Sequence, residues 1–240
     1  MLNILKSDIF RIIKGKLCFY SITGLILFGI FFGVVRDDTP SLESIQDGLS
    51  TASIFVSIFM INIFIIVWGH EFTNRVVNNS LIFGIKRSIY FYSKVLLTFG
   101  MTFLFLAVYT CALAITVWIT SGGFSLLETL KIFFLQMPLY FVVSLLGVLL
   151  FNVIKSGNVA SSIFVALILV GEGLISSVIS TFFPAANALL DTLLFTNIRQ
   201  LTDYLNLSGQ TLSIIFISAL VYGLILYVCS YIVFKERDFK

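Results

Sequence analysis

Charged residues are scarce in this chain: Asp, Glu, Lys and Arg together make up 11% of its 240 residues, whereas hydrophobic residues make up 59%. A soluble domain usually carries about a quarter of charged residues, so this composition leaves too few polar side chains to cover a globular surface. Only three prolines are present, which favours long helices over a loop-rich fold. The composition therefore predicts an all-α integral membrane protein, folded as a single domain.

The few cysteines and the single histidine exclude several kinds of site. Cys18, Cys111 and Cys229 lie within or at the edge of apolar runs and form no CxxC pair, so we interpret them as small apolar side chains rather than disulfide partners. His70 begins the sequence HEFTN, which has Asn74 where a zinc-protease motif needs its second histidine. The chain also lacks a P-loop, a glycine-rich dinucleotide motif and a nucleic-acid-binding motif. We therefore expect no metal, no cofactor and no catalytic residues in this chain, and no nucleic-acid partner.

Six apolar runs are long enough to cross the hydrocarbon core of a bilayer, which is about 30 Å thick and needs about 20 helical residues. Only the fifth run contains an ionisable carboxylate, Glu172, and none shows the strict alternation of a transmembrane β-strand. The predicted spans are residues 17–35, 50–68, 95–120, 132–154, 159–183 and 211–234.

The distribution of positive charge predicts the orientation. Of the 15 Lys and Arg residues, only Arg36, Lys131 and Arg199 fall on the side of the predicted spans opposite the N-terminus. Because Lys and Arg are retained on the cytoplasmic side of a membrane, both termini are predicted to be cytoplasmic. An even number of spans agrees with this orientation.

Residues 1–16 form a separate element before the first span. Leu2, Leu5, Ile9, Ile12 and Ile13 recur at helical spacing, while Asn3, Ser7, Arg11 and Lys14 fall on the opposite face. This pattern predicts an amphipathic helix in the cytoplasmic interface, with its apolar face in the lipid and its cations near anionic headgroups. The alternative is a short cytoplasmic extension that becomes helical only by packing on the bundle.

The loop between the second and third spans, residues 69–94, is too long for a simple turn. Phe72, Val76, Val77, Leu81 and Ile82 have helical spacing, and a glycine follows at position 84, where a helix would end in a left-handed residue. A short amphipathic helix in a cytoplasmic loop is suited to insertion into a groove of a partner protein. In the alternative interpretation, the cations of this loop only hold it on the cytoplasmic side.

Taken together, these features resemble the membrane subunits of type-2 ABC exporters, a permease family that includes lantibiotic-immunity and bacitracin-type peptide transporters. The resemblance consists of an interfacial helix, six spans, the acidic Glu71 after the second span, a G-x-x-R group at residues 84–87, Lys94 at the third span, and an F-x-x-R-D group at residues 234–238. It covers nearly the whole chain.

The resemblance implies that the loop at residues 69–94 contains a coupling helix that docks into a cleft of an ATP-binding subunit. Glu71 would begin the coupling segment, residues 75–83 would make the dock, and Arg87 and Lys94 would anchor the third span at the interface. The implied coupling residues are Glu71, Arg75, Val76, Val77, Asn78, Leu81, Ile82, Phe83, Gly84 and Arg87.

The family also implies the partners and the function. Two ATPase subunits would bind ATP and Mg, and a second six-span permease, identical or related, would complete the pathway in a bacterial plasma membrane. The expected activity is export of an amphipathic or hydrophobic substrate, such as an antimicrobial peptide. A secondary transporter or channel is the alternative, suggested by Pro138 and by the Gly171-Glu172-Gly173 sequence. An intramembrane enzyme is disfavoured, because it would need polar residues in at least two spans.

Two further features have open interpretations. An ionised Glu172 within a span costs at least about 2.5–3.5 kcal/mol, so this side chain should be protonated, paired or hydrated. A structural hydrogen bond across the bundle is the favoured role, and contact with a cationic substrate group and a proton relay are the alternatives. Residues 184–210 have apolar positions at helical spacing. The resemblance implies short helices here that dip back into the outer leaflet, whereas the pattern also fits a helix on the outer surface.

Overall fold

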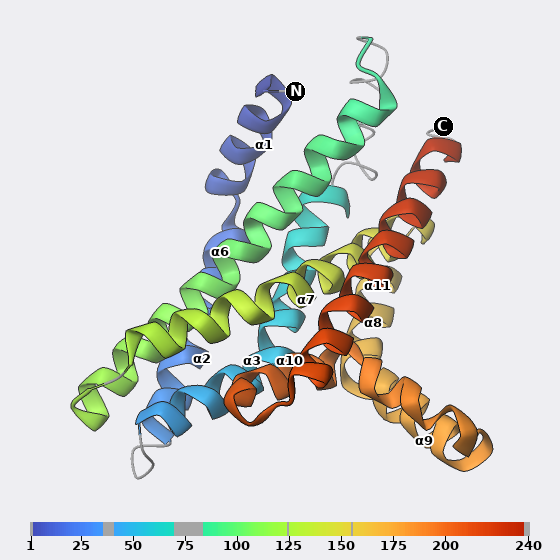
Figure 1. Cartoon of the computed structure of the whole chain (residues 1–240). Helices are drawn as coiled ribbons and strands as arrows, with labels where there is room; N and C mark the ends of the chain where they lie inside the picture. Colours follow the sequence, from blue (N-terminus) through green and yellow to red (C-terminus); the bar gives the residue numbers. More distant parts are fainter. Residues whose placement is uncertain (1, 36–40, 70–83, 124, 155, 238–240) are drawn as a thin grey trace.

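The computed structural model of the chain describes residues 2–35, 41–69, 84–123, 125–154 and 156–237. Within these ranges all regular structure is helical, and six helices are long and apolar enough to cross a membrane. Figure 1 shows these helices assembled into one bundle with both termini at the same end. The predicted all-α fold with six spans is confirmed, and the chain is a multi-pass membrane protein.

The helices occur in the predicted order. Among the described residues, the first elements are α1 (Leu2–Lys14), α2 (Lys16–Val35), α3 (Ser41–Phe64) with its π-helical end η1 (Ile65–Gly69), and α6 (Arg87–Ser121). They are followed by α7 (Leu126–Val153), α8 (Gly157–Ala166), the π-helical η2 (Leu167–Gly171) and α9 (Glu172–Phe182). The chain then forms the short η3 (Pro184–Thr192), α10 (Leu194–Gln200) and η4 (Leu201–Asn206) before α11 (Gly209–Glu236).

Three of the spanning helices begin six to nine residues earlier than the sequence predicted. α3 begins at residue 41 instead of 50, α6 at 87 instead of 95, and α7 at 126 instead of 132. The predicted spans stopped near charged or polar residues, whereas a helix can continue past the hydrocarbon core because its backbone bonds are internal. Residues 87–94 are therefore helical and belong to α6, which corrects the prediction that they form part of a loop.

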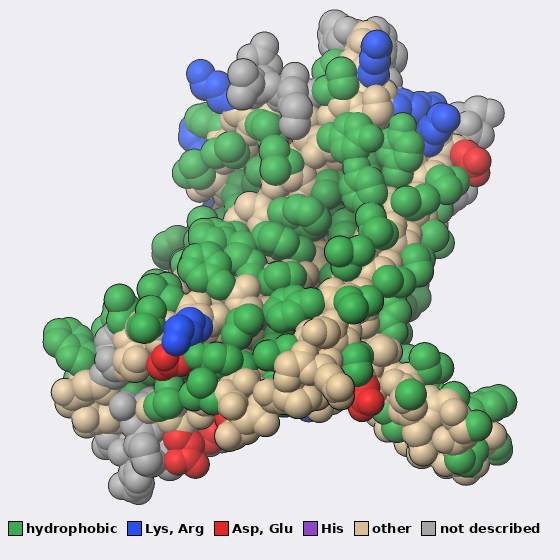
Figure 2. Space-filling model, in the orientation of Figure 1, with side chains coloured by type: hydrophobic (Ala, Val, Ile, Leu, Met, Phe, Trp, Pro, Cys, Tyr) green, Lys and Arg blue, Asp and Glu red, His purple; other side chains and the backbone are tan. Residues whose placement is uncertain are grey.

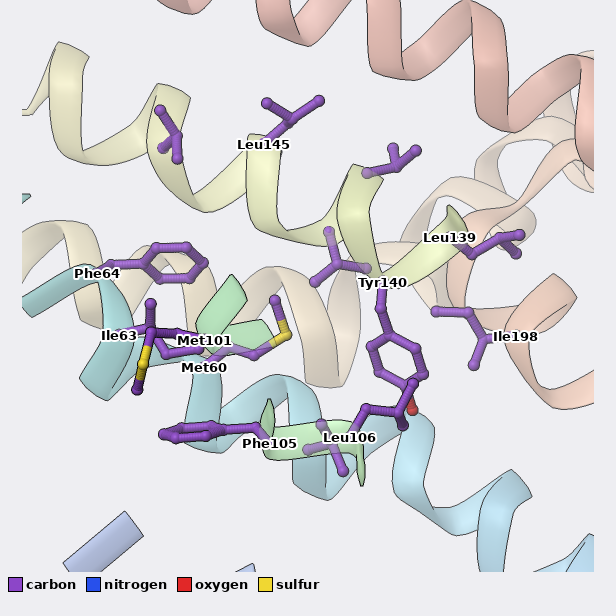
Figure 3. Close-up of a cluster of buried hydrophobic side chains, with 14 of the residues drawn as sticks. Met60, Ile63, Phe64, Met101, Phe105, Leu106, Leu139, Tyr140, Leu145 and Ile198 are labelled. Atoms are coloured by element: carbon purple, nitrogen blue, oxygen red, sulfur yellow. The ribbon is translucent and has the colours of Figure 1, made fainter. Parts of the chain in front are cut away.

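The core lies between α3, α6 and α7. Figure 3 shows part of it, with Met60 and Phe64 from α3, Met101 and Phe105 from α6, and Tyr140 from α7 pointing toward one another. On another side of α6, the glycines of α2 allow close packing. A Cβ atom at Gly29 would lie 2.8 Å from the Cβ of Ala112, so a larger residue there would push α2 away from α6.

The remaining spans are much less buried. In the most apolar part of each span, 61% of residues are buried in α7, but only 17% in α11, 11% in the α8–α9 span and 28% in α2. Figure 2 shows hydrophobic side chains covering the visible face of the bundle. These outward faces are compatible with lipid or with another apolar protein surface, but not with water.

Charge separates the two ends of the molecule. We call the end that carries both termini the inner end and the opposite end the outer end. In Figure 2, Lys and Arg side chains gather mainly at the inner end, and Asp and Glu mainly at the outer end. At the outer end α9 projects away from the bundle, while α10 lies against it (Figure 1).

The N-terminal amphipathic helix is present as α1, but its apolar residues divide between two faces. Asp8 and Ile12 are buried against the bundle, whereas Ile9 and Ile13 are exposed. The sequence had placed the apolar residues together on one lipid-facing side. The division arises because α1 packs against both α2 and α6, so that the helix has a bundle-facing and an outward-facing apolar stripe.

Candidate functional site

Two of the predicted coupling residues, Gly84 and Arg87, belong to the part of the chain that the structure describes. Gly84 has a φ of 84°, so its backbone is left-handed as its position in the sequence predicted. The other predicted coupling residues lie outside the described residues: Glu71, Arg75, Val76, Val77, Asn78, Leu81, Ile82 and Phe83. The candidate site is therefore the set of contacts that attaches the segments on either side of residues 70–83 to the rest of the bundle. We call this set of contacts the inner junction.

Arg87 begins α6 directly after the loop, and its side chain contacts the end of α11. Its Nη1 donates to the carbonyl oxygen of Lys235 at 2.5 Å and to that of Arg237 at 3.3 Å. The last carbonyls of a helix have no partner within the helix and carry partial negative charge, so a guanidinium is a suitable ligand. Arg87 therefore joins the start of α6 to the last turn of α11, a protein contact in addition to its predicted position at the interface.

Arg237 extends this connection to α7. Its Nη1 donates to the carbonyl oxygens of Phe151 at 3.0 Å and Asn152 at 2.7 Å, both in the last turn of α7. Burial lowers the pKa of the Arg237 guanidinium, although arginine stays protonated in proteins. The arginine of the F-x-x-R-D group is thus a cap for another helix. The sequence did not predict this role, because the F-x-x-R-D group contributed only to the family resemblance.

Lys94 forms a buried ion pair with α1. Its Nζ lies 2.6 Å from Oδ2 of Asp8, and the side chains of Lys94 and Asp8 are only 1% and 7% exposed. Arg11 lies on the other side of the same carboxylate, with Nη2 3.3 Å from Oδ1. A buried charge is tolerated when it is paired in this way. The predicted anchor of the third span is therefore held by a specific partner on the N-terminal helix.

Asp8 was not singled out from the sequence, although it carried a signal. It lies three residues after Leu5 and four before Ile12, and these spacings place it on one face of a helix with them. An acidic residue on the apolar face of a basic helix needs a cationic partner when it is buried. The spacing alone does not identify Lys94 as that partner.

The segment before the loop is held against the same helix. Trp68, in η1, donates from Nε1 to the hydroxyl of Thr98 on α6 at 3.1 Å, and Thr98 in turn donates to the carbonyl of Lys94 at 2.9 Å. Arg11 also donates to the carbonyl of Ile66 in η1 at 3.3 Å. The chain is thus attached to α1 and α6 before residues 70–83, and α6, which follows them, is attached to α11 and α1.

Glu172 is at the other end of the bundle and caps α10. Its Oε1 accepts a hydrogen bond from the backbone N–H of Phe195 at 2.5 Å, and its Oε2 accepts from the backbone N–H and the hydroxyl of Thr196 at 2.8 and 2.9 Å. The first N–H groups of a helix lack internal partners, and a carboxylate is favoured there. Nη2 of Arg199 lies 4.0 Å from Oε2. Glu172 therefore makes structural hydrogen bonds, but to the short helix α10 and not to another span across the bundle, and its substrate and proton roles stay predictions.

An apolar pocket of about 390 Å³ lies beside Glu172, between α7, the α8–α9 span, residues 189–195 and α11. Leu146, Ile175 and Leu189 are among its lining residues, and the Glu172 carboxylate is its one acidic lining group. The hydroxyls of Thr192 and Tyr222, also in the lining, lie 2.7 Å apart. A pocket of this composition accepts an apolar group and offers a few polar atoms to orient it.

Residues 184–210 form short helices, and α10 is inserted into the bundle rather than lying free on its surface. Ile198 of α10 is fully buried, and its carbonyl accepts a hydrogen bond from Nε2 of Gln136 on α7 at 2.8 Å. Tyr204 of η4 donates to the Glu128 carboxylate at the start of α7, and this hydrogen bond raises the pKa of Tyr204. We call η3, α10 and η4 the outer cap.

The ranges that the structure describes contain no group of three or more His, Cys, Asp or Glu side chains able to hold a metal ion. No protein-family model matches the chain, and no curated protein matches it. The function is therefore inferred from the helices and contacts described above.

Proposed function

We propose that this chain is the permease subunit of an ATP-driven type-2 ABC exporter. The observation that carries the proposal is the double attachment of the loop at residues 70–83. Trp68 is bonded to α6 before the loop, and Arg87 and Lys94 bind α11 and α1 after it. A loop that only connected two spans would not need a buried ion pair, Asp8–Lys94, beside it, since such a pair is expensive to desolvate.

The same contacts suggest how force would be transmitted. When an ATP-binding subunit binds the loop and displaces it, three elements move as one body: α1, the end of α3 and the start of α6. The Asp8–Lys94 and Trp68–Thr98 contacts join these elements. Arg87 and Arg237 extend this motion to α11 and α7. None of the contacts described for the inner junction involves α8 or α9. Motion of the other helices relative to α8 and α9 would open a path along the sparsely buried α8–α9 span.

The proposal requires partners. The sequence has no nucleotide-binding motif, so ATP and Mg are bound by two separate ATPase subunits. A second six-span permease, identical or related, completes the pathway. The outward apolar faces of α2 and the α8–α9 span provide area for that second permease. The substrate is an amphipathic or hydrophobic molecule, such as an antimicrobial peptide, taken from the membrane of a bacterial cell. The apolar pocket beside Glu172 supports this substrate class.

The test replaces the apolar side of the predicted coupling helix. The double variant Val77→Asp, Leu81→Asp removes two apolar side chains, each worth about 1.5–3 kcal/mol when fully buried, and places charges in a groove that excludes water. We expect the variant to insert normally and retain its permease partner, but to lose the ATPase subunit on purification and to lose transport.

The control is Asn79→Asp, which adds a carboxylate to the same segment, about half a turn of the predicted helix away from both Val77 and Leu81. It should retain both the ATPase subunit, identified by mass spectrometry, and transport. If the double variant co-purifies with the ATPase and transports at the wild-type rate, the loop is not a coupling element and the proposal fails.

A further inference from the structure

An apolar groove lies at the inner end between α1, α2 and α6. It encloses about 590 Å³, and every side chain that lines it is apolar, with Ile9 and Ile13 from α1, Phe19 from α2 and Leu96 from α6 among them. Gly100 of α6 lies in its wall, and a Cβ atom added there would meet no heavy atom within 4 Å. The groove is therefore empty space bounded by three helices and not a tightly packed seam.

The groove faces outward from the bundle. Ile13 is 76% exposed and Phe19 is 67% exposed. Such residues are compatible only with an apolar neighbour, because they would otherwise leave a continuous apolar surface in water. Leu96 and Leu97 of α6 and Ile9 of α1 are close in sequence to Lys94 and Asp8, so the groove lies beside the buried Asp8–Lys94 pair.

Lysines lie near the groove on its α1 and α2 side, without exposed acidic residues beside them. Lys14 and Lys16 are exposed at the junction of α1 and α2, between the lining residues Ile13 and Cys18, and Lys6 is exposed farther along α1. The sequence has no Asp or Glu from residue 9 to residue 35 or from residue 87 to residue 127. The nearby carboxylate of Asp8 is buried and already bound to Lys94 and Arg11. An apolar cavity with lysines at its edge matches a molecule with an apolar tail and an anionic head.

We propose that this groove is a binding site for an anionic phospholipid of the inner leaflet. One acyl chain lies against Phe19, Leu96 and Gly100, and Lys14 and Lys16 hold the phosphate of the headgroup. A second copy of this chain fits less well, because it would have to cover the exposed lysines together with the apolar residues. The acyl chain completes the apolar surroundings of α1 and keeps water from the Asp8–Lys94 pair, so the lipid holds α1 against α6. This site is independent of the proposed transport function.

Fluorescence quenching by brominated lipids tests the proposal on the full chain in nanodiscs. The reporter is Ile13→Trp, an exposed position on the groove, in a Trp118→Phe background that removes the exposed tryptophan of α6. The lipids are phosphatidylglycerol and phosphatidylcholine that carry bromine on one acyl chain, each titrated into unlabelled phosphatidylcholine. We expect phosphatidylglycerol to quench with roughly tenfold higher affinity, because two lysines near the surface contribute to its binding.

Two pairs of variants separate the site from general surface attraction. Lys14→Gln with Lys16→Gln should abolish the preference for phosphatidylglycerol, whereas Lys86→Gln with Lys235→Gln removes the same charge from other exposed inner-end positions and should retain it. Gly100→Leu fills the groove and should reduce quenching by both lipids. The same change at Gly173 on α9, where a Cβ would also meet nothing within 4 Å, should not.

Several results would overturn the proposal. Equal affinity for both lipids in the wild-type groove would exclude headgroup recognition, and equal loss in the two lysine variants would show that the attraction is diffuse. Unchanged quenching in Gly100→Leu would show that the acyl chain lies elsewhere. Protection of the reporter from both lipids, with a dimer that dissociates when Ile13 is changed to Asp, would show that a second copy covers the groove.

Discussion

The inner and outer ends of the bundle are held together by different contacts. At the inner end, Lys94 joins α6 to a carboxylate on the N-terminal helix α1, and Arg237 joins the end of α11 to the end of α7. At the outer end, Glu172 and Gln136 attach the short helix α10 to the long helices beside it. The inner contacts therefore set how the spans lie relative to one another, whereas the outer contacts determine whether the outer cap is closed.

This difference also predicts where the molecule opens most easily. α9 has no buried residue, and the outer cap is built from helices of six to nine residues. Segments with few buried apolar contacts open locally at a lower free energy than the whole protein unfolds. We therefore expect changes at the inner end to reduce global stability and changes at the outer end to loosen the cap alone.

The largest effect is expected for the Asp8–Lys94 pair. Asp8→Leu leaves the ammonium of Lys94, which is 1% exposed, without its carboxylate, and breaking a buried pair in this way costs about 3–5 kcal/mol. The unfolding midpoint of the purified chain in detergent should fall markedly. The double variant Asp8→Leu, Lys94→Met removes both charges and should recover most of the loss. Asp8→Leu with wild-type stability would show that the pair does not hold the inner junction.

A smaller and local effect is expected at Glu172. Glu172→Ala leaves the backbone N–H groups of Phe195 and Thr196 without their acceptor, at about 1–3 kcal/mol for each group that stays buried. Amide hydrogen exchange should accelerate in α10 but not at the start of α6. Glu172→Gln keeps an acceptor oxygen and should show less acceleration.

Transport separates the roles that are still open for Glu172. If the residue serves only to cap α10, Glu172→Gln should insert normally and retain most transport, because the amide preserves hydrogen-bonding capacity. Loss of transport in a variant that folds and assembles normally would instead favour contact with a cationic substrate or a proton relay. The exchange data identify which variants have an intact outer cap.

The sequence was informative about the helices and less informative about the contacts between them. Uncharged runs of Leu, Ile and Phe located every span, because burial in a bilayer depends on composition and length. The true starts of α3 and α6 were missed, since Ser41 and Arg87 lie outside the apolar runs. Arg237 binds Phe151 and Asn152 across more than 80 positions of the chain, and no spacing rule reaches that far.

For Glu172, too, the sequence predicted the kind of contact but not the partner. The cost of a carboxylate within a span predicted that the residue would be hydrogen-bonded, and it is. Its partner, the first turn of α10, depends on how the chain returns after α9 and could not be derived from local pattern. A residue type thus predicted the kind of contact, and only the tertiary structure identified its partner.

The smallest effect is expected at Tyr204, which holds the end of the outer cap through its hydrogen bond to Glu128. This bond raises the pKa of Tyr204, so the stabilisation is fully present below the unfolded pKa, about 10, and is lost as the pH rises through the higher folded value. The unfolding midpoint of the wild type should therefore fall more steeply above pH 10 than that of Tyr204→Phe, while the variant is slightly less stable at neutral pH. Tyr20→Phe, at an exposed position on α2, serves as the control and should follow the wild type. Parallel pH profiles for the wild type and Tyr204→Phe would show that the bond to Glu128 does not hold the cap.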